Sequence, residues 1–452
     1  MGGESGILKK IGMVSLGCPK NLVDSEIMLG LLKKKDYEIV NRQDEADIII
    51  VNTCGFIESA KQESINTIIE MGQNKKKNCK LLIVTGCLAE RYRHQIMEEI
   101  PEVDAVLGTG SYSEIADVVD RAFSGEKKEA YGGLSDVCYL ENDRILSTGN
   151  AYAYLKIAEG CDNRCTYCII PSLRGPFRSR KLEDLVREAE GLAEKGVKEL
   201  ILIAQDTTRY GIDLYKERKL SELIEKISAI DGIQWIRLLY CYPEEIDDRL
   251  LTVVAQNPKV CKYLDIPIQH ASNKILKAMG RRGNSKDISA LLDEIRSKIP
   301  GIILRTSLIV GFPGEDEKDF ESLYEFVKKY RFDRLGVFMY SKEEDTPAAK
   351  MKPQITKKLK KQRYDRLMKM QQLISFEKNK ERLGKEYTVL AEGVADDGIF
   401  YYGRSYQEAP DIDGLIYFTS LEPVQIGEFV TVRILTNEKY DLVGEVKDES
   451  AQ

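Results

Sequence analysis

The chain has 452 residues, of which 43% are hydrophobic, and its 67 basic and 73 acidic side chains give a net charge of −6. This length accommodates about three domains, each with its own core. No stretch reaches the roughly 18 consecutive apolar residues that a membrane-spanning helix needs, and residues 1–6 lack the apolar core of a signal peptide. We therefore expect a cytoplasmic protein without membrane association, and the acidic balance disfavours a nonspecific coat on nucleic acid.

The numbers of cysteines and histidines limit which kinds of metal site and catalytic site the chain can form. The chain has ten cysteines but only two histidines, His94 and His270. Ten cysteines without a secretion signal favour metal binding or catalysis over a disulfide framework. Two histidines leave little material for a histidine-rich metal site or a serine–histidine hydrolase.

Residues 8–125 alternate short apolar strands with helical patterns. We predict strands at 11–16, 46–52 and 80–86, and helices at 21–34 and 58–73. Such alternation is typical of an open parallel sheet that helices cover on both faces. The segment 126–150 that follows has little apolar periodicity and several turn residues, so we predict a linker there.

Three cysteines, Cys18, Cys54 and Cys87, each follow one of these predicted strands. Ligands bind at the carboxyl edge of open parallel sheets, so we expect the three to converge there. Thiolates are the soft ligands of iron-sulfur clusters, and three of them can hold a four-iron cluster that keeps one iron open. The alternative is three buried structural cysteines. We interpret Cys79 and Cys138, which lie elsewhere, as incidental.

Residues 151–382 resume the alternation of strands with helices. Six strands are predicted, at 154–158, 199–204, 235–240, 263–268, 302–310 and 335–340, with helices between them, for example at 182–195 and 288–298. Six such units are typical of a partial (β/α)6 barrel whose site lies at the carboxyl ends of the strands. Polar side chains gather at those predicted ends, namely Gln205, Asp206, Tyr242, Gln269 and His270. We interpret His270 as a polar wall residue and nearby Cys241 as a packed thiol.

A second cysteine run, Cys161, Cys165 and Cys168, follows the first barrel strand, and Tyr167 precedes its last member. Three cysteines on one loop can hold three corners of a four-iron cluster, whose open iron can bind an exogenous group. A zinc site is the alternative, but zinc knuckles need a second cysteine pair downstream, and none follows. The fifth barrel strand runs into Gly311-Phe312-Pro313-Gly314, where glycines would let the backbone approach a flat ligand closely.

The last two segments differ in charge. Residues 350–382 carry twelve Lys and Arg against three acids on an amphipathic helical pattern. We interpret this helix as a solvated basic face or as an ionic partner of the acidic segment that follows. Residues 384–448 contain five short strand patterns, typical of a small antiparallel β-barrel, with thirteen acids and five Lys or Arg. An acidic module suits a basic protein better than RNA, and a merely solubilising surface is the alternative.

The spacing Cys161-x3-Cys165-x2-Cys168, with Tyr167, resembles the signature of the radical S-adenosylmethionine (SAM) superfamily. Nearly the whole chain is similar to the methylthiotransferase family of those enzymes, with an N-terminal methylthiotransferase domain at 8–125, a radical SAM domain at 151–382 and a TRAM barrel at 384–448. Residues 15–26, Ser-Leu-Gly-Cys-Pro-Lys-Asn-Leu-Val-Asp-Ser-Glu, resemble the branch that modifies an aspartate of a ribosomal protein. The tRNA-modifying relatives typically have Gln-Met-Asn after that cysteine. Residues 204–208 and 265–271 are also similar to the family.

The resemblance implies two 4Fe-4S clusters and SAM as cofactors. Cys161, Cys165 and Cys168 would hold the radical-generating cluster, and the auxiliary cluster, which presents sulfur, would be held by Cys18, Cys54 and Cys87. The cofactor-binding residues would include Tyr167, Gln269, Arg305 and Gly311, and no side chain is assigned a direct catalytic role. The implied reaction places a methylthio group on the beta-carbon of an aspartate in a small-subunit ribosomal protein. One SAM would supply the methyl group and a second the radical.

The implied partners are that ribosomal protein, an electron donor such as a flavodoxin or ferredoxin, and a sulfur donor, whereas nucleic acid is not expected as the primary substrate. The sequence leaves three other functions open. The first is the same chemistry on a tRNA adenosine, which a substrate assay would distinguish from modification of the ribosomal protein. An iron-sulfur carrier without catalysis would release no 5'-deoxyadenosine from SAM, and a zinc-stabilised interaction module would be colourless.

Overall fold

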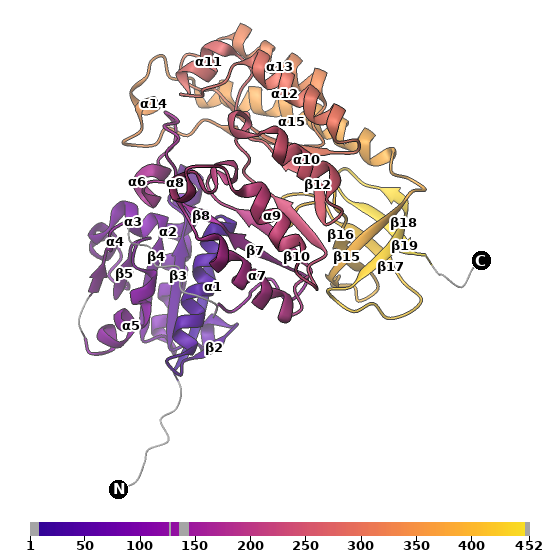
Figure 1. Ribbon diagram of the computed structural model, residues 1–452. Helices are drawn as coiled ribbons and strands as arrows, with labels where there is room; N and C mark the ends of the chain where they lie inside the picture. The colour runs from indigo at the N-terminus through magenta and orange to yellow at the C-terminus, as the bar shows by residue number, and fades with distance from the viewer. Residues whose placement is uncertain (1–8, 126–127, 135–143, 448–452) are drawn as a thin grey trace. The chain divides into compact units, whose positions relative to one another are not determined.

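A computed structural model describes residues 9–125, 128–134 and 144–447 (Figure 1). The chain divides into two compact units, which are described separately. Unit 1 comprises residues 1–147, 158–180 and 341–346, and unit 2 comprises residues 148–157, 181–340 and 347–452. The segment 1–6, in which no signal peptide is predicted, and Cys138 in the predicted linker lie outside the described residues.

A six-stranded sheet in the order β2-β1-β3-β4-β5-β6 forms the centre of unit 1, and all its pairings are parallel. The strands are β1 Lys10–Ser15, β2 Glu38–Val40, β3 Ile48–Thr53, β4 Leu81–Gly86, β5 Ala105–Leu107 and β6 Lys128–Ala130. The predicted parallel sheet is confirmed. β6 lies in the segment that was predicted as a linker. It was not predicted as a strand because three residues without apolar alternation give no recognisable strand pattern.

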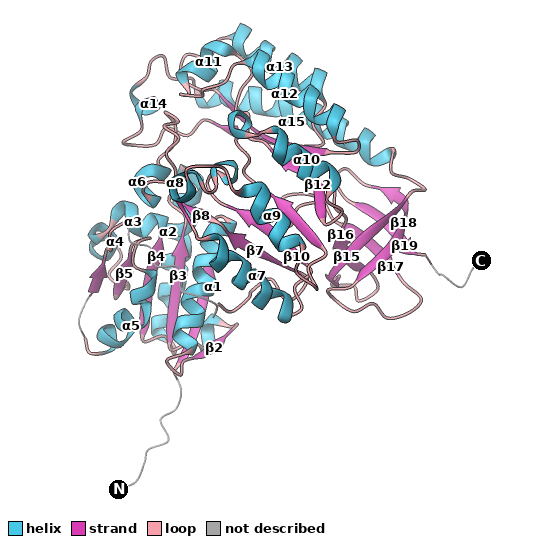
Figure 2. Cartoon of the chain, viewed as in Figure 1, coloured by secondary structure: helices cyan, strands magenta, loops and turns pink. Residues whose placement is uncertain are grey.

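Helices cover both faces of this sheet (Figure 2). They are α1 Pro19–Lys33, α2 Glu58–Gly72, α3 Cys87–Tyr92, α4 His94–Glu99 and α5 Ile115–Phe123, with 3-10 turns at Gln43–Glu45, Gln73–Lys76 and Tyr112–Glu114. Ile48 and Ile50 pack on one face with Met28 of α1, whereas Ile49 packs on the other with Ile68 of α2. Alternate side chains of a strand point to opposite faces, so the continuous apolar run of β3 contributes side chains to the hydrophobic cores on both faces of the sheet.

Two later segments of the chain belong to unit 1. The first contains the antiparallel pair β8 Ala158–Glu159 and β9 Arg178–Ser179, with α6 Ile170–Arg174 between them. The second, residues 341–346, contributes Glu343, whose buried carboxylate pairs with Lys61 at 3.1 Å and with Arg91 at 2.9 Å. Buried carboxylates persist when they are paired in this way.

Unit 2 contains the predicted six parallel strands, in the order β14-β13-β12-β11-β10-β7. They are β7 Tyr152–Lys156, β10 Glu199–Ile203, β11 Trp235–Leu238, β12 Val260–Asp265, β13 Ile303–Val310 and β14 Arg334–Met339. β12 begins three residues before the predicted position and ends at Asp265. The chain leaves the strand there because Pro267 has no backbone N–H to donate to a ladder.

Helices follow the strands in the alternation expected of a partial barrel. They are α7 Leu182–Glu194, α8 Ile212–Tyr215, α9 Leu220–Ser228, α10 Asp248–Gln256, α11 Asn273–Ala278, α12 Ser285–Lys298, α13 Glu317–Tyr330, α14 Pro347–Lys350 and α15 Lys357–Lys380, with 3-10 turns at Thr207–Arg209 and Pro243–Glu245. The basic helix α15 pairs with acids around the barrel. Arg363 binds Glu315 at 2.7 Å, and Lys378 binds Asp333 at 2.6 Å.

The C-terminal segment forms a closed five-stranded barrel in the order β15-β16-β17-β19-β18. Its strands are β15 Glu386–Val394, β16 Tyr401–Arg404, β17 Ile416–Thr419, β18 Phe429–Asn437 and β19 Leu442–Val446. Val389, Phe418 and Val432 are fully buried in its core. Four pairings are antiparallel as predicted, whereas β17 and β19 pair in parallel.

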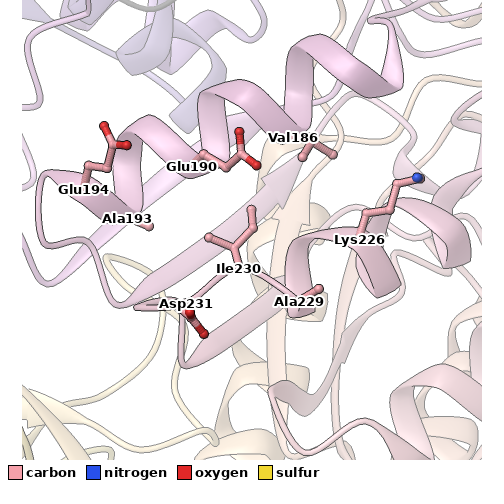
Figure 3. Close-up of a pocket in the computed structure, with 8 residues that line it drawn as sticks. All are labelled: Val186, Glu190, Ala193, Glu194, Lys226, Ala229, Ile230 and Asp231. Atoms are coloured by element: carbon pink, nitrogen blue, oxygen red, sulfur yellow. The ribbon is translucent and has the colours of Figure 1, made fainter.

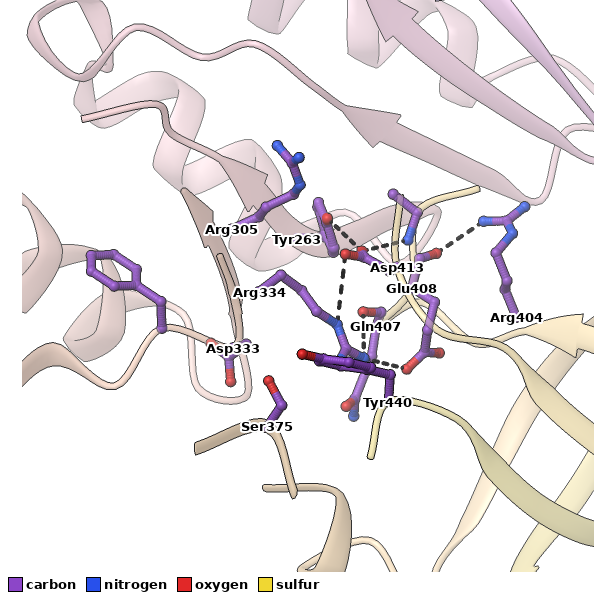
Figure 4. Close-up of polar contacts among 12 residues, drawn as sticks. Tyr263, Arg305, Asp333, Arg334, Ser375, Arg404, Gln407, Glu408, Asp413 and Tyr440 are labelled. Carbon is purple, nitrogen blue, oxygen red and sulfur yellow. Dashed lines mark hydrogen bonds and ion pairs between the residues drawn. The ribbon is translucent and has the colours of Figure 1, made fainter. Parts of the chain in front are cut away.

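Buried charges join this small barrel to the rest of unit 2 (Figure 4). Glu408 binds Arg334 at the start of β14 at 2.7 Å and also pairs with Arg382 just after α15. Asp413 accepts a hydrogen bond of 2.7 Å from the hydroxyl of Tyr263 on β12. The predicted ionic contact between the basic helix and the acidic segment is therefore present, through Arg382.

Candidate functional site

The three strand-end cysteines lie at one edge of the sheet in unit 1. β1, β3 and β4 are neighbours and run parallel, so their carboxyl ends meet at the same edge. Cys18 is the N-cap of α1, Cys54 follows β3 directly, and Cys87 is the first residue of α3. The expected convergence of Cys18, Cys54 and Cys87 is thus a consequence of the strand order.

Two glycines show how closely the three cysteine loops approach one another. Gly17 has a positive φ of 91°, and a Cβ placed on it would lie 2.8 Å from the Cβ of Cys54. A Cβ on Gly55 would lie 2.8 Å from the backbone of Cys87. Neither position has room for a side chain, so glycine is needed at both for the loops to meet.

Asn21 holds two of these loops together. Its side-chain Nδ2 donates to the carbonyl of Leu16 at 3.0 Å and to that of Thr53 at 2.9 Å, and these residues immediately precede the loops of Cys18 and Cys54. Asn52 in turn donates to the backbone carbonyl of Asn21 at 2.8 Å. A buried amide with its donors satisfied in this way fixes the geometry of the surrounding backbone.

The second cysteine run lies on the loop between β8 and α6, also in unit 1. The backbone N–H of Cys161 donates to the carbonyl of Gly175 at 3.1 Å, and that of Cys168 donates to the carbonyl of Cys165 at 3.1 Å. These bonds close the loop on itself. The cysteines have little exposed surface, and the neighbouring Tyr167 is half-buried.

The two cysteine groups share one apolar cluster. Cys87 packs with Ile169, Leu173 and Phe56, and Ile169 is the residue that follows Cys168. The hydroxyl of Thr109, after β5, donates to the carbonyl of Leu173 and fixes α6 to the sheet. Cys87 of the first group and the chain directly after the second group are therefore packed together.

Burial and nearby thiols raise the pKa of Cys54 and of Cys168. Burial raises the pKa of Cys54 to about 12, and the nearby thiols of Cys87 and Cys18 act in the same direction. The pKa of Cys168 is raised by burial and then by Cys165 and Cys161. Buried thiols are deprotonated when a metal ion is bound, because the cation compensates the negative charges. The set of soft donors around each loop therefore fits an iron-sulfur cluster.

Sequence reasoning did not identify Arg174, which is buried beside the first cysteine group. Its Nη1 lies 2.7 Å from Asp24 and 3.2 Å from Glu159. Its Nη2 donates to the side-chain oxygen of Asn21 and lies 3.5 Å from the sulfur of Cys87. The signal available in the sequence was an arginine on the short helix directly after the second cysteine run.

A tyrosine hydroxyl lies near the same charges. Tyr112 is buried, its ring lies 6.0 Å from the guanidinium carbon of Arg174, and among the described residues its hydroxyl has no hydrogen-bond partner. Burial raises the pKa of Tyr112 well above its ordinary value, and Asp24, Cys87 and Glu159 raise it further. Because buried hydroxyls are almost always bonded, this orphaned group is consistent with a polar or sulfur-containing ligand nearby.

The other predicted cofactor-binding residues, Gln269, Arg305 and Gly311, lie in unit 2. Gln269 has a positive φ of 68°, and its backbone bridges to Leu308 at the carboxyl end of β13. Arg305 binds Asp265 at 2.6 Å and is mostly buried. A Cβ on Gly311 would lie 2.3 Å from the Cγ of Lys360, so α15 covers this glycine on its Cβ side, and a ligand contact of its backbone stays a prediction.

His270 and Cys241 are buried in unit 2. Nδ1 of His270 accepts the backbone N–H groups of Ala271 and Ser272, and Nε2 lies 3.5 Å from Glu315. Cys241 lies 3.7 Å from the hydroxyl of Thr207, and burial raises its pKa to about 12. Both contacts agree with the interpretation of a polar wall residue and a packed thiol.

A shallow hollow lies between α7 and α9 of unit 2 and contains none of the predicted site residues (Figure 3). It is lined by Val186, Glu190, Ala193, Glu194, Lys226, Ala229, Ile230 and Asp231. Across the described ranges, no helix combines the length and apolar character needed to cross a bilayer. In the same residues, no three His, Cys, Asp or Glu side chains lie close enough to share a single metal ion, whereas ligands of a four-iron cluster each bind a different iron.

Three protein families match successive parts of the chain. Residues 10–108 match "Uncharacterized protein family UPF0004", residues 155–327 match the radical SAM superfamily, and residues 383–446 match the TRAM domain. A protein of Acetivibrio thermocellus named ribosomal protein uS12 methylthiotransferase RimO is 62% identical over 98% of this chain and 100% of its own length. A protein of the same name from Lachnoclostridium phytofermentans is 56% identical over 96% of this chain and 99% of its own.

Among solved structures, the fold is similar to that of the radical SAM methyltransferase TsrM of Kitasatospora setae, solved with cobalamin and a [4Fe-4S] cluster bound. The TM-score is 0.58 at 13% sequence identity, over 76% of this chain and 74% of that one. At this identity the likeness concerns the fold.

Proposed function

Because the chain belongs to the RimO family of radical SAM methylthiotransferases, we propose that it attaches a methylthio group to the beta-carbon of an aspartate in ribosomal protein uS12. The relatives that carry this name match nearly the whole chain. We place the reaction in the cytoplasm, where ribosomal proteins are modified. The proposed cofactors are two 4Fe-4S clusters and SAM.

Six cysteines of unit 1 would hold the clusters. Cys161, Cys165 and Cys168 would hold the radical-generating cluster, and the auxiliary one would be held by Cys18, Cys54 and Cys87. When bound, such clusters supply the electron that cleaves SAM and the sulfur that is transferred. The chain itself would supply soft donors that are buried or partly buried, and would leave one iron of each cluster without a protein ligand.

One observation carries this proposal: both cysteine groups belong to one compact unit, and Cys87 packs against the residue that follows Cys168. A protein that only stores or transfers clusters has no need for two three-cysteine groups in one compact unit. A methylthiotransferase needs them, because the carbon radical that one SAM generates must meet a sulfur held by the other group. Tyr167, Gln269, Arg305 and Gly311 stay predicted contacts of SAM.

The substrate is proposed to be a protein rather than a tRNA. The C-terminal barrel segment, residues 384–448, carries thirteen acids against five Lys or Arg. Some of these acids, such as Glu408, are buried in ion pairs, but the net negative charge of the segment still disfavours a phosphate backbone and favours a basic protein. An electron donor such as a flavodoxin or ferredoxin and a separate sulfur donor complete the proposed partners.

Intact-mass measurement tests the proposal. The reconstituted enzyme is incubated with SAM, reductant and sulfide, with uS12 and bulk tRNA in separate reactions. We expect a gain of about 46 mass units, the replacement of H by SCH3, on uS12 only. The same gain on tRNA alone would establish the second candidate, methylthiolation of an adenosine. No gain on either would overturn the assignment of a methylthiotransferase.

Cysteine variants test which residues hold iron. Cys87→Ala and Cys168→Ala should each lose about half of the bound iron and abolish transfer, because a cluster with only two remaining ligands is not retained. Cys79→Ala is the matched control, since Cys79 is buried in the apolar core of the same unit and its thiol donates a hydrogen bond of 3.2 Å to the carbonyl of Leu81. An equal loss of iron in all three variants would contradict the assignment. Iron and sulfide analysis provides the measurement.

A further inference from the structure

We propose that Arg174 is a positioning residue that donates a hydrogen bond to the Cys87 sulfur of the auxiliary cluster and thereby raises the reduction potential of that cluster. The inference rests on the proposed function, because it assumes that Cys18, Cys54 and Cys87 hold a cluster. It concerns a residue outside both cysteine groups. Arg174 lies on α6, directly after the loop of the other group.

The two terminal nitrogens of the Arg174 guanidinium, Nη1 and Nη2, contact different partners. Nη1 is anchored by Asp24 at 2.7 Å and Glu159 at 3.2 Å, both of them buried carboxylates. Nη2 faces the cluster side, where it donates to Asn21 and lies 3.5 Å from the sulfur of Cys87. A planar fork with several donors can satisfy all four partners at once, which a lysine ammonium on a flexible stem cannot do.

Arg174 is also connected to the loops of the other two auxiliary cysteines. The Asn21 side chain that accepts from Arg174 donates in turn to the carbonyls of Leu16 and Thr53, which precede the loops of Cys18 and Cys54. One cation thus contacts one sulfur directly and orients the loops of the other two through a single amide. Partners of metal ligands at this distance commonly set ligand orientation and redox potential.

The electrostatic direction follows from burial. The Arg174 side chain is 2% exposed, so its charge is weakly screened by water. Reduction adds an electron to a cluster that already carries thiolate charge, and a fixed cation beside one sulfur stabilises the reduced form. Hydrogen bonds to cluster sulfurs are among the factors that set the potentials of iron-sulfur centres. Removing Arg174 should therefore shift the potential to more negative values, and removing a neighbouring negative charge should shift it to more positive ones.

The test uses the full chain with Cys161, Cys165 and Cys168 replaced by alanine, so that the auxiliary cluster can be titrated alone. In this background, Arg174→Met should lower the midpoint potential, and Asp24→Asn should raise it. Electron-nuclear double resonance of the reduced cluster should show an exchangeable proton coupling that Arg174→Met abolishes. Lys61→Met is the matched control, because Lys61 is a buried cation of the same unit that pairs with Glu58, Glu343 and Glu344 and donates to the hydroxyl of Tyr92.

The outcomes separate the inference from the proposed function. If the background chain binds no iron at the remaining three cysteines, the auxiliary cluster and the proposed function both fail. If it binds a cluster whose potential and proton coupling are the same with and without Arg174, only the inference is overturned. A general loss of folding would move Arg174→Met and Asp24→Asn in the same direction, whereas charge moves them in opposite directions. If Arg174→Met retains no cluster, the variant Arg174→Lys is used instead. The inference then requires that Arg174→Lys retains the auxiliary cluster with a lower midpoint potential and an altered proton coupling, and an unchanged potential and coupling overturn it.

Discussion

Glu408 offers a direct test of how the C-terminal barrel is attached to the rest of unit 2. Its carboxylate is 2% exposed and pairs with Arg334 on β14 and with Arg382 after α15. It also accepts hydrogen bonds from the hydroxyl and the backbone N–H of Ser405, at 2.6 and 3.1 Å. The substitution Glu408→Gln keeps the shape of the side chain and removes its charge, leaving Arg334 and Arg382 without their shared partner. Figure 4 shows the pairing of Glu408 with Arg334.

The magnitude follows from the pKa of Glu408, which its arginine partners and Ser405 lower from 4.5 to about 2 against the opposing effect of burial. A difference of about 2.5 pKa units corresponds to about 3.4 kcal/mol of stability at pH 7, at about 1.4 kcal/mol per unit. Breaking a buried ion pair by removing one partner typically costs about 3–5 kcal/mol, which agrees. Because the folded-state pKa is depressed, this contribution is complete above pH 4.5 and is lost as the pH falls from 4.5 to about 2.

Urea denaturation of the wild type and of Glu408→Gln at several pH values provides the assay. At pH 7 we expect the variant to be less stable by about 3–5 kcal/mol. At pH 3.5 the difference should be smaller by about 1.4 kcal/mol, because the unfolded wild-type chain then takes up a proton. Glu422→Gln, at an exposed position of the same barrel segment, is the control and should change stability by less than about 0.5 kcal/mol. Equal effects of the two variants at pH 7, or a difference that does not shrink at low pH, would refute the argument.

Two further predictions concern unit 2. Cys241→Ala should keep full iron content and transfer activity and lose only about 1 kcal/mol of unfolding free energy, because Cys241 is a packed thiol beside Thr207; loss of iron would contradict this. Gly311→Ala should destabilise the protein by about 1–3 kcal/mol, since its φ is 71° and the new Cβ would meet Lys360. Shortening the neighbour in Gly311→Ala/Lys360→Ala should recover part of that loss, and denaturation curves that show no recovery would mean that backbone strain alone is responsible.

Long buried strands were predictable from the sequence, whereas strands of three residues were not. Runs such as Ile48–Val51 are apolar at every position, because both faces of the sheet are covered by helices. Such a run is easily recognised in the sequence as a buried strand. β2, β5 and β6 have three residues each, which is too short for a periodic pattern. Likewise, nothing in the local sequence of β17 and β19 indicates that they pair in parallel, because strand pairing depends on the closure of the whole barrel.

The candidate site was predictable as two cysteine groups but not as one assembly. The position of each cysteine after a strand, or on one short loop, is a local property of the chain. The packing of Cys87 against Ile169 joins residues 82 positions apart, and no periodic pattern encodes such a contact. Arg174 was missed for the same reason, because its partners Asp24 and Asn21 lie about 150 positions away along the chain.

The motif after Cys18 contains one residue that the two branches of the family share, Asn21, and two residues that differ between them. The resemblance was recognised from Pro-Lys-Asn after Cys18, where tRNA-modifying relatives typically have Gln-Met-Asn. The asparagine common to both is the residue that bonds two cysteine loops and accepts from Arg174. Pro19, in contrast, is the first residue of α1, where its missing N–H costs no helical hydrogen bond, so the change from glutamine to proline is tolerated locally. Under the proposed function, Asn21 would serve both branches in the same way, and the choice between protein and RNA would be made by other surfaces, of which the charge distribution favours the acidic C-terminal barrel.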